Sequence, residues 1–391
     1  TSQTPEEAGP QLTWGGEIRT RSFGREPVQG EWDSWISMRS RFALDGRWDQ
    51  GFRFFLQVQD VRYWGEETSN RDLSADAVDF HQAYLEVEDL PGVGGRIRAG
   101  RQEVQLGEGR FISAPDWGQA GQSFDGLLWS RGVGTRNFEV LYLRTREGSS
   151  DAHDTSADFS AVSFTTPLPN VGSLQLLAIH DRSTALLDTR QGTLELETRQ
   201  TTLGPIWKWE KGELALRAQG MLQFGERDRK DVSAHMLAVS TRIQVLNGRG
   251  NVTLWYDRLS GDSDPLDPDE AAFSTLFGAR HRYYGRADYF LTIPEDTGDL
   301  GLEDAAVKLA FRPSPLLGIN LELHRFRTAE AGNLRSRHLA EELDVWASYL
   351  FRGALRVDAG FSMLWAGEAM EELGRLDGTG TTVYLMTSLR F

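Results

Sequence analysis

The feature that most constrains this chain is an alternation of apolar and polar residues with a period of two. In residues 355–365, six apolar side chains alternate with Arg356, Asp358, Gly360 and Ser362, and a leucine holds the remaining even position. The same alternation occupies residues 214–224, 305–311, 317–323, 343–351 and 381–391. Successive side chains of a β-strand point to opposite faces, so each run predicts a strand with one apolar and one polar face.

The length of these runs separates the possible architectures. Strands of soluble proteins average ~5–6 residues, whereas a tilted strand needs ~9–11 residues to cross a bilayer. The patterned runs last about ten to thirteen residues and therefore favour membrane crossing. We predict about eighteen strands, an even number, at residues 11–23, 35–46, 50–62, 79–89, 95–105, 123–131, 136–146, 157–167, 172–182, 199–210, 212–224, 232–245, 248–259, 303–312, 316–327, 340–351, 353–365 and 380–391.

The connections between the predicted strands alternate between long and short. The long ones are residues 24–34, 63–78, 106–122, 183–198, 260–302, 328–339 and 366–380, and the short ones are 47–49, 90–94, 132–135, 168–171, 211, 246–247 and 352. A soluble all-β fold, the alternative, has no reason to sort loop length by face. Outer-membrane barrels have short periplasmic turns and long extracellular loops, and closure leaves no unpaired strand edge. We therefore expect a transmembrane antiparallel β-barrel, all-β, of about 18 strands.

The remaining composition narrows the class further. The chain has no cysteine, which excludes a disulfide scaffold, and no apolar run of the ~18 residues that a spanning helix needs. Its net charge of -15 argues against nucleic acid as a partner. Residues 1–10 are expected to form an N-terminal periplasmic extension, and residues 11–391 a single barrel domain. The chain opens without a signal-peptide pattern, so Thr1 is expected to follow a removed signal or a trimmed start.

No motif of an enzyme or a cofactor site is present. Nucleophile, metal-protease and phosphate-loop patterns are missing from the sequence, and no residue is nominated as catalytic. The seven histidines have no metal-ligand spacing, because His281, His324 and His338 belong to separate segments. We expect no catalysis, no cofactor and no metal.

If the apolar faces meet lipid, the polar faces enclose a pore, and strand parity points many cations inward. The predicted lumen cations are Arg19, Arg21, Arg39, Arg41, Arg53, Arg217, Arg242, Lys308 and Arg356. Inward acids are also predicted, at Glu86, Glu213, Glu322, Asp344 and Asp358. Two interpretations stay open: a ladder of salt bridges that stiffens the wall, or a basic constriction that selects polyanions. The net charge does not decide between them, because many of the acids lie in predicted loops.

Two segments carry a family resemblance. Residues 94–129 contain Gly100-Arg101-Gln102, then a Gly-rich loop with Trp117, then Phe124-Asp125-Gly126, and residues 273–291 read FSTLFGARHRYYGRADYFL. In this order the segments resemble the alginate-export family of bacterial outer-membrane porins. The resemblance implies passive translocation through an Arg-lined lumen, with periplasmic partners in secreting systems. It also implies that Arg101 reaches the channel, which requires a β-bulge because Ile97 and Ala99 share its side.

The longest connection, residues 260–302, has two possible placements. Folded into the pore mouth, it would set Arg280, Arg282, Tyr284 and Arg286 over the channel, beside His281. The alternative is a solvated outer loop without a ligand. In both cases Asp125 and Asp288 are expected to be partners of nearby arginines.

Together these patterns predict a monomeric porin in the outer membrane of a Gram-negative bacterium, surrounded by lipid. Its solute is expected to be an acidic polysaccharide, alginate-like, or the oligosaccharides of one, crossing by passive diffusion. Two alternatives remain: a general or neutral-sugar uptake porin, and a structural or surface-binding barrel within a larger envelope complex. Conductance and anion block would separate the three.

Overall fold

The structure is a computed structural model that describes residues 9–26, 32–65, 78–146, 157–189, 192–264 and 266–391. The expected extension at residues 1–10 falls mostly outside this range. Nineteen strands form one sheet among the described residues, and each long strand is antiparallel to both neighbours. The long strands are β1 (Gln11–Arg25), β2 (Asp33–Arg47), β3 (Phe52–Tyr63), β4 (Asp79–Glu88), β5 (Arg96–Gln102), β6 (Phe124–Val133), β7 (Arg136–Arg146), β8 (Ala157–Leu168), β9 (Gly172–Thr189), β10 (Gly192–Lys211), β11 (Leu214–Arg227), β12 (Lys230–Val245), β13 (Gly250–Leu259), β15 (Leu302–Ser314), β16 (Leu317–Arg327), β17 (His338–Phe351), β18 (Leu355–Ala366) and β19 (Thr379–Arg390).

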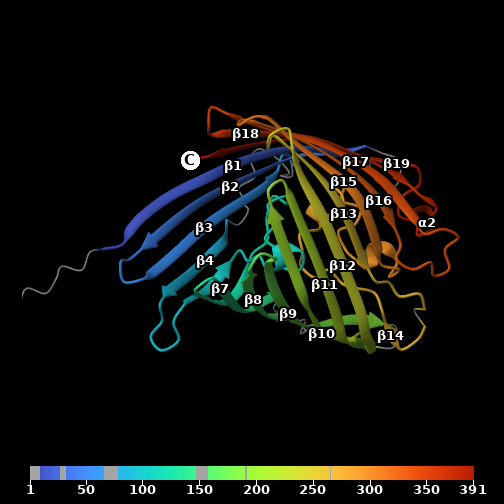
Figure 1. Ribbon diagram of the computed structural model, residues 1–391, viewed down its shortest axis with the longest axis horizontal. Helices are drawn as coiled ribbons and strands as arrows, with labels where there is room; N and C mark the ends of the chain where they lie inside the picture. Colours follow the sequence, from blue (N-terminus) through green and yellow to red (C-terminus); the bar gives the residue numbers. More distant parts are fainter. Residues whose placement is uncertain (1–8, 27–31, 66–77, 147–156, 190–191, 265) are drawn as a thin grey trace, which may run out of the picture.

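The sheet closes on itself through its first and last strands. β1 pairs with β2 on one side and with β19 on the other, with Glu17 opposite Arg390 (Figure 1). The amide nitrogen of Gly16 donates to the carbonyl oxygen of Phe391 at 2.9 Å, and the reverse bond measures 3.1 Å. The prediction of an antiparallel barrel of about 18 strands is confirmed. Only β14 (Asp269–Glu270), a two-residue strand parallel to β12, was not expected.

The outer face of the barrel exposes large apolar side chains, as the alternation predicts. Leu85 and Leu127 both lie opposite Ala99 in the strand register and are 66% and 52% exposed. Leu222 on β11 is 59% exposed. Water does not favour so much apolar area on a sheet face, whereas bilayer hydrocarbon does. No helix among the described residues is long and apolar enough to span a membrane.

The connections differ from the prediction at one end of the barrel. Residues 183–198 were expected to be a long loop, but β9 continues to Thr189 and β10 begins at Gly192. This stretch alternates threonine, leucine and glutamate, which suits a strand hairpin that extends beyond the bilayer. β11 and β12 are likewise joined only by Asp228 and Arg229, both with positive φ. Long and short connections therefore do not alternate strictly.

Two long connections fold into the barrel. Residues 103–123, here called the first inner segment, join β5 to β6, and residues 260–301, the second inner segment, join β13 to β15. The two segments touch each other through a parallel bridge between Ile112 and Phe277. The second segment carries the short helix α1 (Arg280–Tyr283). A further short helix, α2 (Glu368–Glu372), follows β18.

The hydrophobic core lies inside the barrel, between these inner segments and the wall. Phe111, Ile112 and Phe273 of the inner segments are all 0% exposed. They belong to one cluster with the inward side chains Leu141, Leu143, Phe159, Ala161, Leu177, Ile179, Ile206, Met221, Val232, Ala234, Met236 and Ala238. The expectation that only polar faces enclose the lumen is thus wrong for the wall from β7 to β12. There the inner face meets the buried segments instead of water.

Candidate functional site

The two segments that carry the family resemblance meet inside the barrel. The indole nitrogen of Trp117 donates to Asp288 at 3.0 Å, and the indole stacks on the ring of His281 with centroids 4.0 Å apart. Nδ1 of His281 lies 2.5 Å from the other oxygen of Asp288. Asp288 was expected to partner an arginine, but its closest contacts are Trp117 and His281. These motif residues therefore hold the two inner segments together.

Four predicted lumen arginines bind the first inner segment. Arg19 donates to the carbonyl oxygen of Asp116 at 2.5 Å, and Arg21 donates to that of Trp117 at 2.7 Å. Arg39 reaches the Asp116 carboxylate at 2.8 Å, and Arg41 reaches the carbonyl oxygen of Ala120 at 3.1 Å. All four are nearly buried. They lie on the inward face, as parity predicts, and they hold the first inner segment in place, although Arg19 also lines the second cavity described below.

A buried ion pair holds the start of the same segment. Arg110 lies 2.5 Å from Asp257 of β13 and donates to the hydroxyl of Tyr284 at 2.9 Å. Arg110 and Asp257 are both almost fully buried. Burial disfavours the charged guanidinium, yet the Asp257 carboxylate outweighs that penalty and raises the pKa of Arg110. The segment is therefore fixed to the wall by a charge pair within an apolar core.

The second inner segment is tied to β17 through its backbone. The amides of Arg286 and Ala287 donate to Oε1 of Glu342 at 2.6 and 2.9 Å. Gly285 has φ +84°, and a Cβ there would lie 2.5 Å from the Glu342 carboxylate. Only glycine fits this approach without strain, which gives the Tyr-Gly pair of the resembling motif a structural role.

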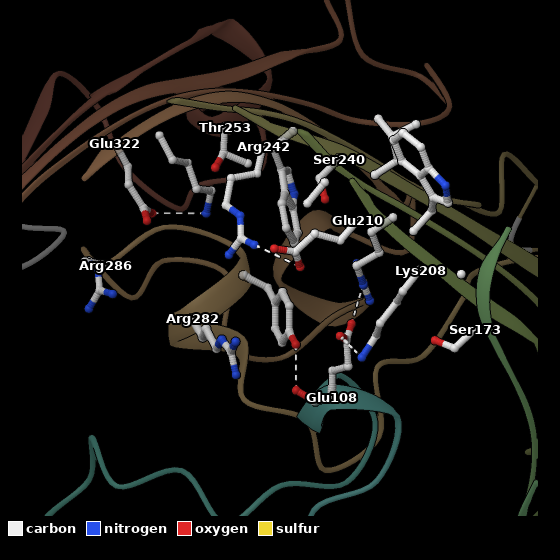
Figure 2. A pocket seen from close by; sticks show the side chains of 18 residues that line it. Glu108, Ser173, Lys208, Glu210, Ser240, Arg242, Thr253, Arg282, Arg286 and Glu322 are labelled. Atoms are coloured by element: carbon white, nitrogen blue, oxygen red, sulfur yellow. Dashed lines mark hydrogen bonds and ion pairs between the residues drawn. The ribbon is translucent and has the colours of Figure 1, made fainter. Parts of the chain in front are cut away.

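A polar cavity of ≈ 820 Å³ remains beside the inner segments (Figure 2). Its lining includes Lys208 and Arg217 from β10 and β11, together with the cations Arg242, Arg282, Arg286 and Lys308 and the acids Glu108, Glu210 and Glu322. Trp255 and Tyr283 add aromatic surface, with ring centroids 5.9 Å apart. The cavity therefore combines cations with aromatic faces.

Several cations of this cavity have carboxylate partners. Glu108 of the first inner segment bridges Lys208, at 2.5 Å, and Arg217. Burial works against the Glu108 carboxylate, but these two cations more than compensate and lower its pKa. Lys308 pairs with Glu322 at 3.0 Å.

Arg282 and Arg286 differ from these. Neither has a carboxylate within ion-pair distance among the described residues. Arg282 stands over the ring of Tyr283, with 5.6 Å from its guanidinium carbon to the centroid, and Arg286 lies 3.7 Å from the ring centroid of Trp346. Figure 2 shows Arg282, Arg242 and Lys208 around the same space. Arg286 also shares a hydrogen bond of 3.2 Å with Nε2 of His281, so Arg282 is the more available of the two for an anion.

A second, larger cavity of ≈ 1390 Å³ opens at the short-turn end of the barrel. It shares Arg242 with the first cavity. Its other charged lining residues are Arg19, Arg249, Arg312, Arg356, Arg390, Asp116 and Asp358. Short turns mark the periplasmic end of an outer-membrane barrel. The second cavity is therefore a periplasmic vestibule, and Arg242 is part of the wall of both cavities.

The remaining predicted site residues lie in different environments. Arg53 bridges Asp45 at 2.9 Å and lies 3.7 Å from Glu86, within the inner wall. Arg356 pairs with Asp358 at the vestibule. Arg280 turns back to Thr275 of its own segment, and burial lowers its pKa.

Two predicted lumen residues are not at the channel. Arg101 lies opposite Ala83 and Asp125, on the exposed face of β5, and pairs with Asp125 at 3.0 Å. No bulge interrupts its pairing with β4 or β6, so it points away from the lumen. Tyr284 is 2% exposed beneath Arg110, and its neighbour Tyr283 lines the cavity instead.

Sequence reasoning missed several lining residues. Lys208 follows from parity, because Trp207 and Trp209 flank it on the opposite face. Arg249 and Arg312 lie beside strand ends, where parity gives no direction. Glu108 and Tyr283 belong to inner segments without a period, and no signal in the sequence alone would have found them.

Comparison with known proteins agrees with this architecture. The Alginate export family model matches residues 10–380. Among solved structures, Pseudomonas aeruginosa OccK3 (OpdO) is 14% identical, with 97% of this chain and 95% of that chain covered and a TM-score of 0.65. OccK8 (OprE) of the same organism is 13% identical over 98% and 99%, with a TM-score of 0.66. OpdK with vanillate is 12% identical over 97% and 98%, with a TM-score of 0.60. No curated protein matches the sequence.

Proposed function

Because the chain belongs to the alginate-export family of outer-membrane channels, we propose that it passes acidic oligosaccharides, or an acidic polysaccharide such as alginate, through its basic lumen. The protein is an outer-membrane porin of a Gram-negative bacterium, as its family and its structural neighbours are. The family and the structural neighbours are porins and not enzymes. The solute class is the proposal.

The charge of the lumen is the observation that supports an acidic solute. Eleven Lys or Arg and five Asp or Glu line the two neighbouring cavities, an excess of six positive charges. The whole chain has a net charge of -15. The lumen is therefore charged opposite to the protein, and its field attracts anions because potential in a narrow cavity is set by nearby charges.

The arrangement of side chains fits a chain of uronate sugars. A guanidinium presents a planar fork that matches a carboxylate, and Arg282 and Arg286 have no competing carboxylate among the described residues. Tyr283 and Trp255 offer flat apolar surface to sugar faces. The cations of the inner cavity and of the vestibule would offer an anion a series of weak binding sites. Weak sites in series let a solute enter the channel and also leave it.

Planar-bilayer recording tests the proposal. The wild-type channel should prefer chloride to potassium, and trigalacturonate should block it at lower concentration than neutral maltotriose. An Arg282→Ala/Arg286→Ala double variant should weaken the block about tenfold or more, because each charge-assisted hydrogen bond is worth about 1.5–3 kcal/mol. The matched control is Arg325→Ala, an arginine of β16 on the exposed face. Cation preference, or equal block by both sugars, would reject an acidic solute.

A closed structural barrel is the second candidate. Two inner segments with fully buried aromatic residues fill part of the lumen, and a scaffold barrel would need no through-passage. A folded protein that inserts into bilayers yet shows no conductance would favour it over the channel.

A further inference from the structure

Three potential metal ligands meet on the inner wall between β16 and β17. Glu322, His324 and Asp344 each bring one ligand atom within 4.8 Å of the others. The strand register places Glu322 opposite Asp344 and His324 opposite Glu342. These residues lie on adjacent strands and share the inward face. Their separation along the sequence explains why histidine spacing predicts no metal here.

The histidine has the orientation of a metal ligand. Nδ1 of His324 lies 2.9 and 3.0 Å from the two oxygens of Asp304 on β15. A carboxylate accepts, so Nδ1 carries the proton, and Nε2 faces Oε2 of Glu322 at 3.2 Å. In a neutral imidazole these two facing atoms are both acceptors. A cation between them resolves the conflict, and a carboxylate behind Nδ1 commonly orients metal-bound histidines.

The charge of the cluster leaves room for a dication. Asp304, Glu322, Glu342 and Asp344 contribute four carboxylates, and Lys308 lies 3.0 Å from Glu322. Arg286 is the other cation near Glu322. Four carboxylates therefore meet two side chains that are cations at any working pH, Lys308 and Arg286. Asp304 and Asp344 are 0% exposed, and burying unpaired carboxylates is costly.

Three carboxylate oxygens in the cluster lack a partner. Both oxygens of Asp344 and Oε2 of Glu342 are buried and accept no hydrogen bond from the described residues. Ser362 and the Glu342 carboxyl lie close to Asp344 without meeting strict hydrogen-bond geometry. Buried carboxylate oxygens are normally satisfied. A proton shared by Glu342 and Asp344, or a cation bound between them, would satisfy these oxygens.

We propose that this cluster binds a divalent transition-metal ion, of which zinc is the probe, through Nε2 of His324 and the carboxylates of Glu322 and Asp344. Imidazole with carboxylates is an accepted zinc donor set. Asp304 orients the histidine, and Glu342 stands ready as a fourth ligand. Ions can enter from the lumen, because Glu322 lines the inner cavity.

The site would couple the wall to the second inner segment. Oε1 of Glu342 already holds the amides of Arg286 and Ala287, while its Oε2 is free for the metal. Binding would thus fix β16, β17 and the inner segment at one point. Metal should slow hydrogen exchange at the amides of Arg286 and Ala287.

The first test is zinc titration of the full-length barrel, purified in detergent without a histidine tag and treated with chelator. Calorimetry should show one equivalent bound by the wild type. His324→Gln and Asp344→Asn should each weaken affinity at least tenfold. The matched control, His180→Gln, replaces an exposed histidine of β9 and should leave affinity unchanged. Unaltered binding in both site variants, or no stoichiometric binding by the wild type, would overturn the proposal.

The second test identifies the donor directly and does not depend on affinity. Cu²⁺ binds such sites more tightly than zinc, and its electron spin echo modulation should report one imidazole nitrogen. That signal should vanish in His324→Gln and persist in His180→Gln. If His324 is instead an imidazolium paired with Asp304 and Glu322, wild type and His324→Gln will give the same spectrum. A circular dichroism spectrum that matches the wild-type spectrum shows that each variant is folded.

Discussion

Two walls of the lumen hold the same segment by different chemistry. The start of the first inner segment, with Phe111 and Ile112, packs against apolar side chains of β7 to β12. Its later part, residues 116–120, is held by arginines of β1 and β2. Apolar packing is non-directional, whereas the arginines fix individual carbonyl oxygens. The difference teaches that one wall supplies burial and the other sets position.

The largest expected effect comes from the fully buried charge pair of Arg110 and Asp257, which holds the start of the first inner segment. Arg110→Met leaves Asp257 buried without its partner and should destabilise the protein by about 3–5 kcal/mol. Urea unfolding in detergent measures this. The double variant Arg110→Met/Asp257→Leu should recover most of the loss, because removing both charges is often near neutral. No recovery would show that the pair itself, and not the orphaned charge, matters.

Truncation of the apolar anchor should come next. Phe111→Ala removes a ring that is 0% exposed and should cost about 3 kcal/mol, at the low end for such changes because a loop can relax. Hydrogen exchange should rise at residues 104–112 and stay low at 116–120. Equal loosening of both parts would remove the distinction between the two walls.

The arginine side should give the opposite pattern. Arg39→Ala removes bonds to Asp116, to the carbonyl of Gln119 and to Glu17. We expect the free energy of unfolding to fall by about 2 kcal/mol. The loss is limited because Glu17 keeps its ion pair with Arg19 at 3.0 Å. Exchange should rise at residues 116–120 only. Arg325→Ala again serves as control.

A pH dependence should distinguish Glu108. Burial disfavours the charged carboxylate, but Arg217 and Lys208 outweigh burial and lower the pKa of Glu108 below its ordinary value of 4.5. A carboxyl group whose pKa is lowered by folding stabilises the folded state fully above pH 4.5. That stabilisation is lost as the pH falls through the lowered pKa of the folded state. Glu108→Gln should lose about 2 kcal/mol at pH 7. Below pH 4.5, the stability of Glu108→Gln should vary less with pH than that of the wild type. Acid unfolding of both proteins measures this difference.

The smallest effect is expected outside the barrel. Arg101 and Asp125 form an exposed pair, so Arg101→Ala should change stability by at most about 1 kcal/mol and less in high salt. Anion selectivity should be unchanged. A large loss of selectivity would place this arginine at the channel after all.

The alternation of the sequence was enough to predict the barrel, and it also gave the inward direction of Arg217, Arg242 and Lys308. It worked because their neighbours Leu216, Ile243 and Val307 are apolar and face outward. For Arg101, the same alternation pointed outward, and the family resemblance was misleading. Parity says which face a side chain joins, but not whether water or a buried segment covers that face.

The contents of the lumen depend on contacts that no local pattern encodes. Arg19 and Asp116 are 97 residues apart, and Trp117 and Asp288 are 171 apart. Tyr284 was expected at the channel, but an irregular segment has no period that would distinguish it from Tyr283. The cluster around His324 required the register of β15, β16 and β17, which strand prediction does not supply.

The pairing of β1 with β19 joins residues far apart in the chain: Thr20 and Thr387, whose hydroxyls lie 2.7 Å apart, are 367 positions apart, and Glu17 and Arg390 are 373 apart. Closing a loop of that size costs more chain entropy than forming any hairpin between consecutive strands. We therefore expect this seam to be the last pair of strands to form. Until then β1 and β19 are the unpaired edge strands of an open sheet, and the inner segments can enter between these two edges.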